Sequence, residues 1–402
     1  MERIQIIVIS KNSGLVENLE VRIREIQPNY QIIKAASVQQ TLNFLRMSKA
    51  VIMDADSGKG EIVEFINTLN TEFPYILKFL WVDGRRREFL KELVPEIKGL
   101  LPQCLWKQQS EAVIAEAVCR AIFFADWLDY KQVNKALAQM RDIPTVPFIY
   151  FKLMNLLNDL NASVEDMSET IAEDPSLCAK VLKLANSAII GLREPVSSPF
   201  EAVMQLGVER IRAFFLSSRF VTQFDQQKVP WFSIERFWNH SILTANFARR
   251  IALSRTGDTR VADASFTAGL LHDVGILLIA ANNPTVYKEI ISTSISNNVP
   301  LHIAEKSIFS FTHSEIAACL LSAWGLPLAI LEAIAAHHKP GEGFSSGFSP
   351  LAAVHIANAF ANEKDQNSNL YGDTSLDNEY LLKINCDTQL EEFKKVCFES
   401  AL

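Results

Sequence analysis

No histidine occurs before residue 240 of this 402-residue chain, although the chain contains seven. An imidazole-based catalytic or metal site is therefore excluded from the residues before that position, because the side chain that most often binds metals or moves protons near neutral pH is missing there. This segregation is the first indication of where the chemistry of the protein is located.

Cysteine pairs, basic charge and long apolar runs are also scarce. The six cysteines are scattered at positions 104, 119, 178, 319, 386 and 397 without a CxxC pair, which argues against thiolate zinc and a disulfide framework. The net charge of −7 argues against a general nucleic-acid binder. We find no signal-peptide pattern and no run of the roughly 18–20 apolar residues that a membrane span needs. We therefore expect a soluble, cytoplasmic protein without a membrane partner.

Short apolar runs alternate with helical patterns in the N-terminal part of the chain. The runs occupy residues 4–9, 30–35, 50–53, 76–82 and 97–106, and the helical patterns occupy about 13–26, 38–47, 61–69, 85–93 and 110–128. Strands that alternate with helices at this spacing are typical of a parallel sheet. The sequence therefore predicts an α/β domain with a five-stranded parallel sheet, helices on both faces and a flavodoxin-like arrangement.

Polar residues at the ends of two predicted strands carry a resemblance to a known family. Asp54 ends the third strand-like run, and Lys107 ends the fifth. Residues 1–125 resemble a response-regulator receiver domain, in which the matching aspartate accepts the phosphoryl group and the matching lysine contacts it. The resemblance implies a phosphoacceptor-like site at Asp54 and Lys107.

The sequence departs from the receiver pattern where that family binds magnesium. An acidic pair normally follows the first strand, but Ser10 and Lys11 occupy these positions, and the hydroxyl position after the fourth strand is Val82. Because Mg²⁺ needs carboxylate oxygens and a lysine would repel it, no magnesium is expected here. We interpret this part as a degenerate receiver used for contacts, and phosphorylation of Asp54 stays open as the alternative.

The rest of the chain has helical patterns only. Its punctuation predicts a helical linker at 126–142, helical parts at 143–225 and 226–362, and a polar loop with a final helix at 363–402. Within these parts, residues 281–300 are expected to form a polar connector. The Gly/Ser-rich segment after His338 is expected to form a mobile loop.

Three motifs in this helical part carry a second resemblance. They are IPTVP at residues 143–147, EDPSLCAKVLKLANSA at 173–188 and AVMQLG at 202–207. In this order they resemble the HDOD domain, an all-helical bacterial signalling module that is related to HD phosphohydrolases. The resemblance implies an all-helical C-terminal domain and a role in bacterial signal transduction.

The apolar stretch AGLLHDVGILLI, at residues 268–279, contains an adjacent histidine and aspartate, His272 and Asp273. Burying an ionised carboxylate alone is costly, so buried charges are normally paired or bound to a metal. Imidazole and carboxylate ligands suit Zn, Fe or Mn, and the pair therefore marks a candidate metal site.

The order of the histidines resembles the ligand string of the HD-superfamily metal phosphohydrolases, including the HD-GYP cyclic-dinucleotide phosphodiesterases. The matching positions are His240, His272, Asp273, His313, His337 and His338, and the final aspartate position is Asn358. The resemblance implies one site in which the shared aspartate bridges two divalent metals and a hydroxide attacks phosphorus. In an active enzyme, His272 and Asp273 would be its catalytic centre.

Three departures argue against catalysis. The neutral Asn358 leaves the site one negative charge short, and Ile276 stands where HD-GYP enzymes have a lysine for phosphate. The GYP signature is absent after His338. His302 and His355 match no ligand position, and we interpret both as structural or surface residues.

Two functions are compatible with these patterns. The preferred hypothesis is a non-enzymatic bacterial signalling protein whose HDOD module binds a partner protein or a nucleotide ligand, in two-component or cyclic-dinucleotide pathways. The alternative is a metal-dependent phosphohydrolase that acts on a nucleotide or a cyclic dinucleotide. The oligomeric state, including a homo-oligomer, stays open.

Overall fold

The computed structural model divides the chain into two compact units. The first comprises Met1–Ile143 together with Cys319–Leu328, and the second comprises Pro144–Ala318 together with Ala329–Leu402. The structure describes residues 3–83, 87–98, 100–144, 163–173, 178–179, 181–182, 185–186, 196–364 and 375–399. Much of the IPTVP and EDPSLCAKVLKLANSA motifs, and the polar loop expected after residue 364, lie outside the described residues.

The first unit contains the predicted five-stranded parallel sheet. Its strands are β1 (Ile4–Ile9), β2 (Tyr30–Ala35), β3 (Ser48–Asp54), β4 (Leu77–Val82) and β5 (Gln103–Trp106), in the order β2-β1-β3-β4-β5. This order is that of flavodoxin-like folds and is consistent with a receiver-like domain. The prediction of the sheet is confirmed.

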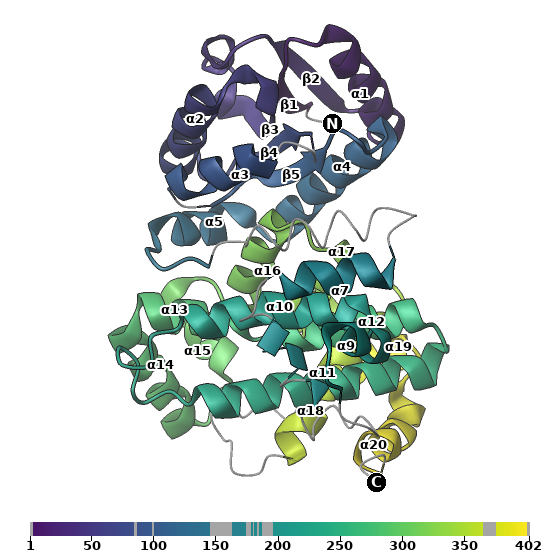
Figure 1. The fold of residues 1–402 in the computed structure, drawn as a ribbon. Helices are drawn as coiled ribbons and strands as arrows, with labels where there is room; N and C mark the ends of the chain where they lie inside the picture. The colour runs from purple at the N-terminus through teal and green to yellow at the C-terminus, as the bar shows by residue number, and fades with distance from the viewer. Residues whose placement is uncertain are drawn as a thin grey trace. The chain divides into compact units, whose positions relative to one another are not determined.

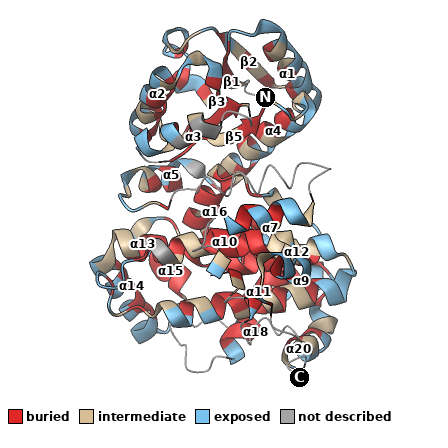
Figure 2. Cartoon of the chain, viewed as in Figure 1, coloured by how far each residue is buried: buried red, intermediate tan, exposed pale blue. Residues whose placement is uncertain are grey.

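Helices cover both faces of this sheet. They are α1 (Ser13–Ile26), α2 (Lys59–Glu72), α3 (Arg87–Leu93), α4 (Glu111–Trp127) and α5 (Tyr130–Gln139). Helices α1 and α4 lie together on one face, and α2 and α3 lie on the other (Figure 1). Strands covered on both faces read as continuous apolar runs, and Figure 2 shows β1 and β3 largely buried.

The helix expected at residues 38–47 is replaced by two short 3₁₀ helices, Val38–Thr41 and Leu45–Met47. The Thr41 hydroxyl donates to the Val38 carbonyl at 2.7 Å, and the Ser48 hydroxyl donates to the Phe44 carbonyl at 2.9 Å. Hydroxyl side chains that bond to nearby carbonyls compete with a regular helix. The prediction of one helix was therefore wrong.

The fifth strand is shorter than the predicted run at 97–106. It begins at Gln103, directly after Pro102, and a 3₁₀ helix occupies Val94–Glu96. Proline cannot donate to a strand ladder, so pairing with β4 starts only after it.

The described part of the second unit is all-helical, as predicted. Its helices are α7 (Val164–Ala172), α9 (Pro199–Leu206), α10 (Val208–Gln223), α11 (Ile234–Thr256), α12 (Thr259–Leu271), α13 (Val274–Asn282), α14 (Pro284–Asn297), α15 (Leu301–Phe309), α16 (His313–Ala323), α17 (Leu328–Ala336), α18 (Pro350–Lys364), α19 (Asn378–Lys383) and α20 (Leu390–Phe398). The last residues of α16, from Cys319 on, are assigned to the first unit. Helix α11 packs against both α12 and α18, and α12 also packs against α18. Figure 1 labels all three helices.

The expected polar connector at 281–300 is a helix, α14, and that prediction was wrong. Pro284 occupies the first turn, where its missing N–H costs nothing, and Asn298 ends the helix in the left-handed conformation. A buried stripe that starts at Tyr287 and ends at Ser294 faces the interior. The asparagines at both ends of this segment are typical of a connector, although the residues between them form an amphipathic helix.

One helical stretch, Thr259–Asn282, is long and apolar enough to pass a length and composition test for a membrane span. This stretch covers α12 and α13. The structure buries 89% of its most apolar window inside the protein. A helix that is apolar all round is normally buried. We therefore assign the stretch to the core of the second unit.

Two glycines let the helices around this stretch approach one another closely. A Cβ atom on Gly269 would lie 2.9 Å from the Ala245 Cα atom of α11. A Cβ atom on Gly275 would lie 2.0 Å from the His313 carbonyl oxygen at the start of α16. These contacts bring α12 against α11 and α13 against α16, and any larger side chain would separate them.

We predict that Gly275→Ala destabilises the second unit by about 1–3 kcal/mol, because the added methyl group overlaps a backbone oxygen that cannot move alone. Gly347→Ala is the matched control, since a Cβ atom there meets open space. Chemical denaturation followed by far-UV circular dichroism measures both. Equal stability of the two variants would contradict the close approach.

Candidate metal centre

His272 and Asp273 lie at the junction between α12 and α13. Asp273 has φ −106° and ψ 4°, outside the helical range, so the helix breaks there and two consecutive side chains face the same space. His272 is completely buried, and Asp273 exposes 3% of its surface. The break therefore puts a carboxylate into the core beside an imidazole.

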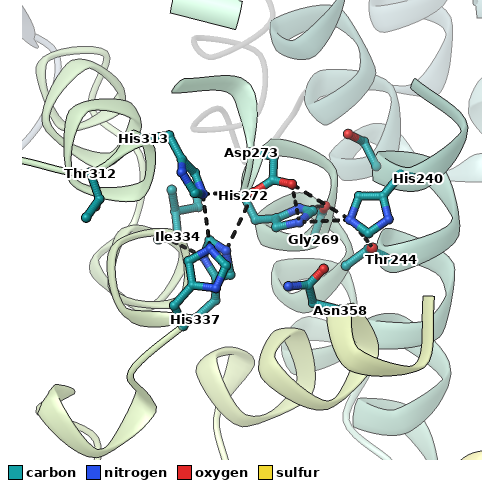
Figure 3. A network of polar contacts seen from close by, with 12 residues as sticks. His240, Thr244, Gly269, His272, Asp273, Thr312, His313, Ile334, His337 and Asn358 are labelled. Atoms are coloured by element: carbon teal, nitrogen blue, oxygen red, sulfur yellow. Dashed lines mark hydrogen bonds and ion pairs between the residues drawn. The ribbon is translucent and has the colours of Figure 1, made fainter. Parts of the chain in front are cut away.

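Each oxygen of the Asp273 carboxylate faces a different pair of histidines. Oδ2 lies 3.1 Å from His272 Nε2 and 3.7 Å from His240 Nε2. Oδ1 lies 3.2 Å from His313 Nε2 and 3.6 Å from His337 Nε2. Figure 3 shows Asp273 between these two sides. A carboxylate placed in this way can be shared by two metal positions.

The described residues contain two groups of side chains that could hold a metal ion, and both include Asp273. One consists of Asp273, His313, His337 and His338, and the other consists of His240, His272 and Asp273. Within each group the ligand atoms lie within 4.8 Å of one another. The structure thus brings together the six matching ligand-type residues singled out from the sequence.

Asn358, the seventh position, extends from α18 beside this cluster (Figure 3). It is buried, and its Oδ1 atom accepts a 3.4 Å hydrogen bond from the Asn362 amide. An amide is a weaker ligand than a carboxylate and brings no negative charge.

The outer nitrogens of two of the histidines are tied to backbone carbonyls. His272 Nδ1 lies 2.7 Å from the Gly269 carbonyl, and His337 Nδ1 lies 2.9 Å from the Ile334 carbonyl. A carbonyl accepts only, so Nδ1 carries a proton and Nε2, which faces Asp273, is the nitrogen that can bind a metal. Both imidazoles are thus oriented as ligands before any ion arrives.

His313 is backed by a buried carboxylate instead. Glu305 Oε2 accepts from His313 Nδ1 at 2.7 Å and from the His313 backbone N–H at 2.9 Å, and its Oε1 accepts from the Tyr287 hydroxyl at 2.5 Å. Neither Glu305 nor Tyr287 is marked by a motif in the sequence. Glu305 follows the buried Leu301 by one helical turn, and this spacing was the signal that it faces the interior. Tyr287 was missed because it lies in the segment that was expected to be a polar connector.

Burial and charge act against each other in this cluster. Burial raises the pKa of Asp273, but the charge of His272 and hydrogen bonds from the surrounding imidazoles hold it well below its usual value. Burial lowers the pKa of His313, but Glu305 and Asp273 raise it to about 10. Burial also lowers the pKa of His337, to about 4. The charges around Asp273 thus favour protonated His313, and burial favours neutral His337.

The donor set fits a divalent metal. His337 Nε2 is buried and makes no hydrogen bond within the described residues, although it lies 3.6 Å from a carboxylate oxygen. Leaving a buried polar atom unsatisfied costs about 1–3 kcal/mol, and ligation by a metal would remove that cost. Imidazole nitrogens with one carboxylate are the ligands of zinc, iron and manganese sites.

His302 and His355 are both buried, so the surface interpretation was wrong and the structural one stands. The His302 ring stacks on His338 at a centroid distance of 4.3 Å. His355 Nδ1 lies 2.7 Å from the His337 carbonyl, and its Nε2 accepts from the Asp377 N–H at 2.9 Å. His355 therefore fixes the backbone that carries the His337–His338 pair.

The segment after His338 is held more firmly than a mobile loop. The fully buried Glu332 carboxylate accepts from the backbone N–H groups of Phe344 and Ser345, both at 2.6 Å, and from the Ser345 hydroxyl. A buried carboxylate stays charged only when such donors surround it. The expected mobile loop is thus anchored on α17.

In the first unit, the phosphoacceptor-like Asp54 is also buried and engaged. Its Oδ2 accepts from the Ser10 hydroxyl at 2.7 Å, and its Oδ1 accepts from Lys107 Nζ at 2.6 Å. Lys107 also bonds to Asp56 at 2.7 Å. A cavity of about 440 Å³ adjoins this network and is lined by Lys11, Asn12, Ser13, Asp54, Asp56 and Ser57. Lys11 in the lining and Lys107 on the two aspartates thus place positive charge beside the Asp54 and Asp56 carboxylates.

A family model described as the HDOD domain matches residues 143–340. An uncharacterized protein of Treponema pallidum (strain Nichols) is 26% identical over 201 residues, which are 49% of this chain and 38% of that protein. The chain therefore matches well under half of the length of that relative.

Two solved structures share the fold. An HDOD domain protein of unknown function from Geobacter sulfurreducens is 24% identical, with a TM-score of 0.50, over 69% of this chain and 90% of that one. A putative phosphohydrolase from Shewanella amazonensis SB2B is 23% identical, with a TM-score of 0.51, over 68% of this chain and 94% of that one. At these identities the likeness concerns the fold alone.

We predict that His355→Phe lowers the free energy of unfolding by about 1–3 kcal/mol, because the His337 carbonyl and the Asp377 N–H lose their partner in the interior. His355→Asn is the control, since its amide keeps a donor near the Nδ1 position and should lose less. Urea denaturation distinguishes them. A phenylalanine variant as stable as the parent would show that this link carries no stability.

Proposed function

Because residues 143–340 form an HDOD domain, we propose that this chain is a bacterial signal-transduction protein that acts by binding rather than by catalysis. In this proposal a degenerate receiver is joined to an HDOD module with a divalent metal site, held by His240, His272, Asp273, His313, His337 and His338. The partner is a signalling protein or a nucleotide ligand of a two-component or cyclic-dinucleotide pathway in the cytoplasm.

The observation that carries this proposal is that the side chains that could hold a metal are buried together, with little room for a substrate beside them. His240, His272, Asp273, His313 and His337 each expose 3% of their surface or less, and His338 is only partly exposed. A metal ion fits among side chains that are packed in this way, whereas a phosphodiester needs an open coordination position and room beside it. The arrangement favours a metal that stabilises the module over one that meets a substrate.

Two further features of the second unit support a binding role. Asn358 supplies no charge at the position where the hydrolase family has its last acid. Ile276 is buried, 1% exposed, at the position where HD-GYP enzymes have a phosphate-binding lysine. Without the acid, a second metal would be held by fewer charged ligands, and without the lysine the negative charge that develops on a phosphodiester would lack a cationic contact.

The first unit supports a role in contacts. Both oxygens of Asp54 already accept hydrogen bonds, from Ser10 and from Lys107, so the carboxylate is satisfied within the protein without a metal ion. Lys11 lines the adjoining cavity where the family places magnesium ligands. The proposal therefore gives this unit a protein–protein role that does not depend on phosphorylation.

A metal-dependent phosphohydrolase is the second candidate, and one observation favours it. The Asp273 carboxylate faces a pair of histidines with each oxygen, which is the geometry of a shared ligand between two metals. In such a site the metals would activate water and clamp the phosphate. This chain's residues would orient the ions and hold them in a dry pocket.

Metal analysis combined with an assay separates the two candidates. We expect the purified protein to contain zinc, iron or manganese, to lose it in His272→Ala, and to hydrolyse neither bis(p-nitrophenyl) phosphate nor cyclic dinucleotides. The readouts are elemental analysis and product formation. Turnover that disappears in His272→Ala would replace the binding proposal with the hydrolase.

Acetyl phosphate tests the first unit. We expect no labelling of the parent protein with radioactive acetyl phosphate, with or without Mg²⁺, because Asp54 is buried and paired with Lys107. Asp54→Ala serves as the background. Magnesium-dependent label that is absent from Asp54→Ala would show that the unit is a working phosphorylation switch.

A further inference from the structure

We propose that the two candidate metal positions have unequal affinities, and that Glu305 and Asn358 set the difference. We call the group of Asp273, His313, His337 and His338 the Glu305-backed position, and the group of Asp273, His240 and His272 the Asn358 position. The inference rests on the proposed metal site and goes beyond it, because it assigns a role to two side chains outside these groups and an order to the filling.

The number of donors differs between the two positions. The Glu305-backed position offers three imidazoles and one carboxylate oxygen, Asp273 Oδ1, which is a full tetrahedral set. The Asn358 position offers two imidazoles and Asp273 Oδ2. A neutral amide stands next to the second set where a carboxylate would complete it, so this position has fewer donors and less charge.

The support behind the donors differs as well. Glu305 and Tyr287 are both completely buried, and the Tyr287 hydroxyl holds the Glu305 carboxylate at 2.5 Å. That carboxylate then accepts from both N–H groups of His313. A carboxylate behind a ligating histidine fixes the ring and its tautomer and makes the facing nitrogen a stronger donor. Glu305 and Tyr287 therefore act as positioning residues for His313.

The Asn358 position has weaker support. His272 Nδ1 meets the backbone carbonyl of Gly269, which is a neutral acceptor. The hydroxyl of Thr244 lies 3.5 Å from His240 Nε2, the nitrogen that faces Asp273, and so competes for the donor atom. Both the donor count and the second layer of contacts thus point to the same order of affinity.

The consequence is sequential loading. At a limiting metal concentration the module holds one ion at the Glu305-backed position, which ties α13 to α16 and to the end of α17. The Asn358 position fills only at higher concentration and then adds α11 to the same cluster. The occupancy of that second position is therefore graded by the metal supply.

Calorimetric titration of the metal-stripped full-length protein with Zn²⁺, in competition with a chelator, tests this inference. We expect two binding events that differ at least 10-fold in Kd. Glu305→Gln keeps the shape but removes the charge, and we expect it to weaken the tighter event about 10- to 100-fold while the weaker one stays within about threefold. Asn358→Asp is expected to strengthen the weaker event and to leave the tighter one in place.

Two further variants keep the test decisive. Glu332→Gln removes an equally buried charge whose hydrogen bonds go to Phe344 and Ser345, and both events should keep their affinity. Tyr287→Phe removes the hydroxyl that holds the Glu305 carboxylate, so we expect it to weaken the tighter event as Glu305→Gln does. It replaces Glu305→Gln if that variant fails to fold. Thermal unfolding without metal checks the fold of each variant.

The outcomes separate this inference from the proposed function. Two events of equal affinity in the parent protein, or a Glu305→Gln variant in which only the weaker event changes, would overturn the unequal positions and leave the metal site intact. A parent protein that binds no Zn²⁺ would overturn the metal site itself.

Discussion

The buried Asp273 carboxylate is the group on which the arrangement of the second unit depends. A negative charge in a helical core is unfavourable unless donors surround it, and here four imidazoles approach its two oxygens at 3.1–3.7 Å. The same demand explains the break between α12 and α13. A continuous helix there would direct His272 and Asp273 away from each other, and the charge would lose its nearest partner.

The convergence on Asp273 requires helices that nearly touch. Gly269 brings α12 against α11, which carries His240, and Gly275 brings α13 against the first turn of α16, which carries His313. A glycine on each side of the His272–Asp273 pair thus allows the close helix contacts that the site requires. The capping box formed by Thr312 and Glu315 starts α16 at the position that aims His313 inward.

The sequence was sufficient to predict the sheet and the all-helical second unit, because apolar periodicity is a local pattern. The six ligand-type residues were singled out through the resemblance to HD phosphohydrolases, and the structure brings them together. The sequence was not sufficient for Glu305 and Tyr287. Their role depends on α14 and α15 lying against α16, and no local pattern encodes such a long-range contact. The helix expected at 38–47 failed for a different reason, since side-chain hydroxyls there compete with the backbone ladder.

The two units surround their buried aspartates, Asp54 and Asp273, with different side chains. In the first unit, lysine neutralises the aspartate that a metal would otherwise neutralise, and the result is a closed network of Ser10, Asp54 and Lys107. In the second unit, histidines surround the aspartate with ring nitrogens that are candidate ligands for an ion.

The most direct test of this account is a crystal structure with anomalous-difference maps collected at the absorption edges of zinc, iron and manganese. The account predicts a peak between Asp273 and the Nε2 atoms of the histidines, at ligand distances of about 2.0–2.3 Å. Imidazoles that point to separate surfaces, with no peak at Asp273, would contradict it.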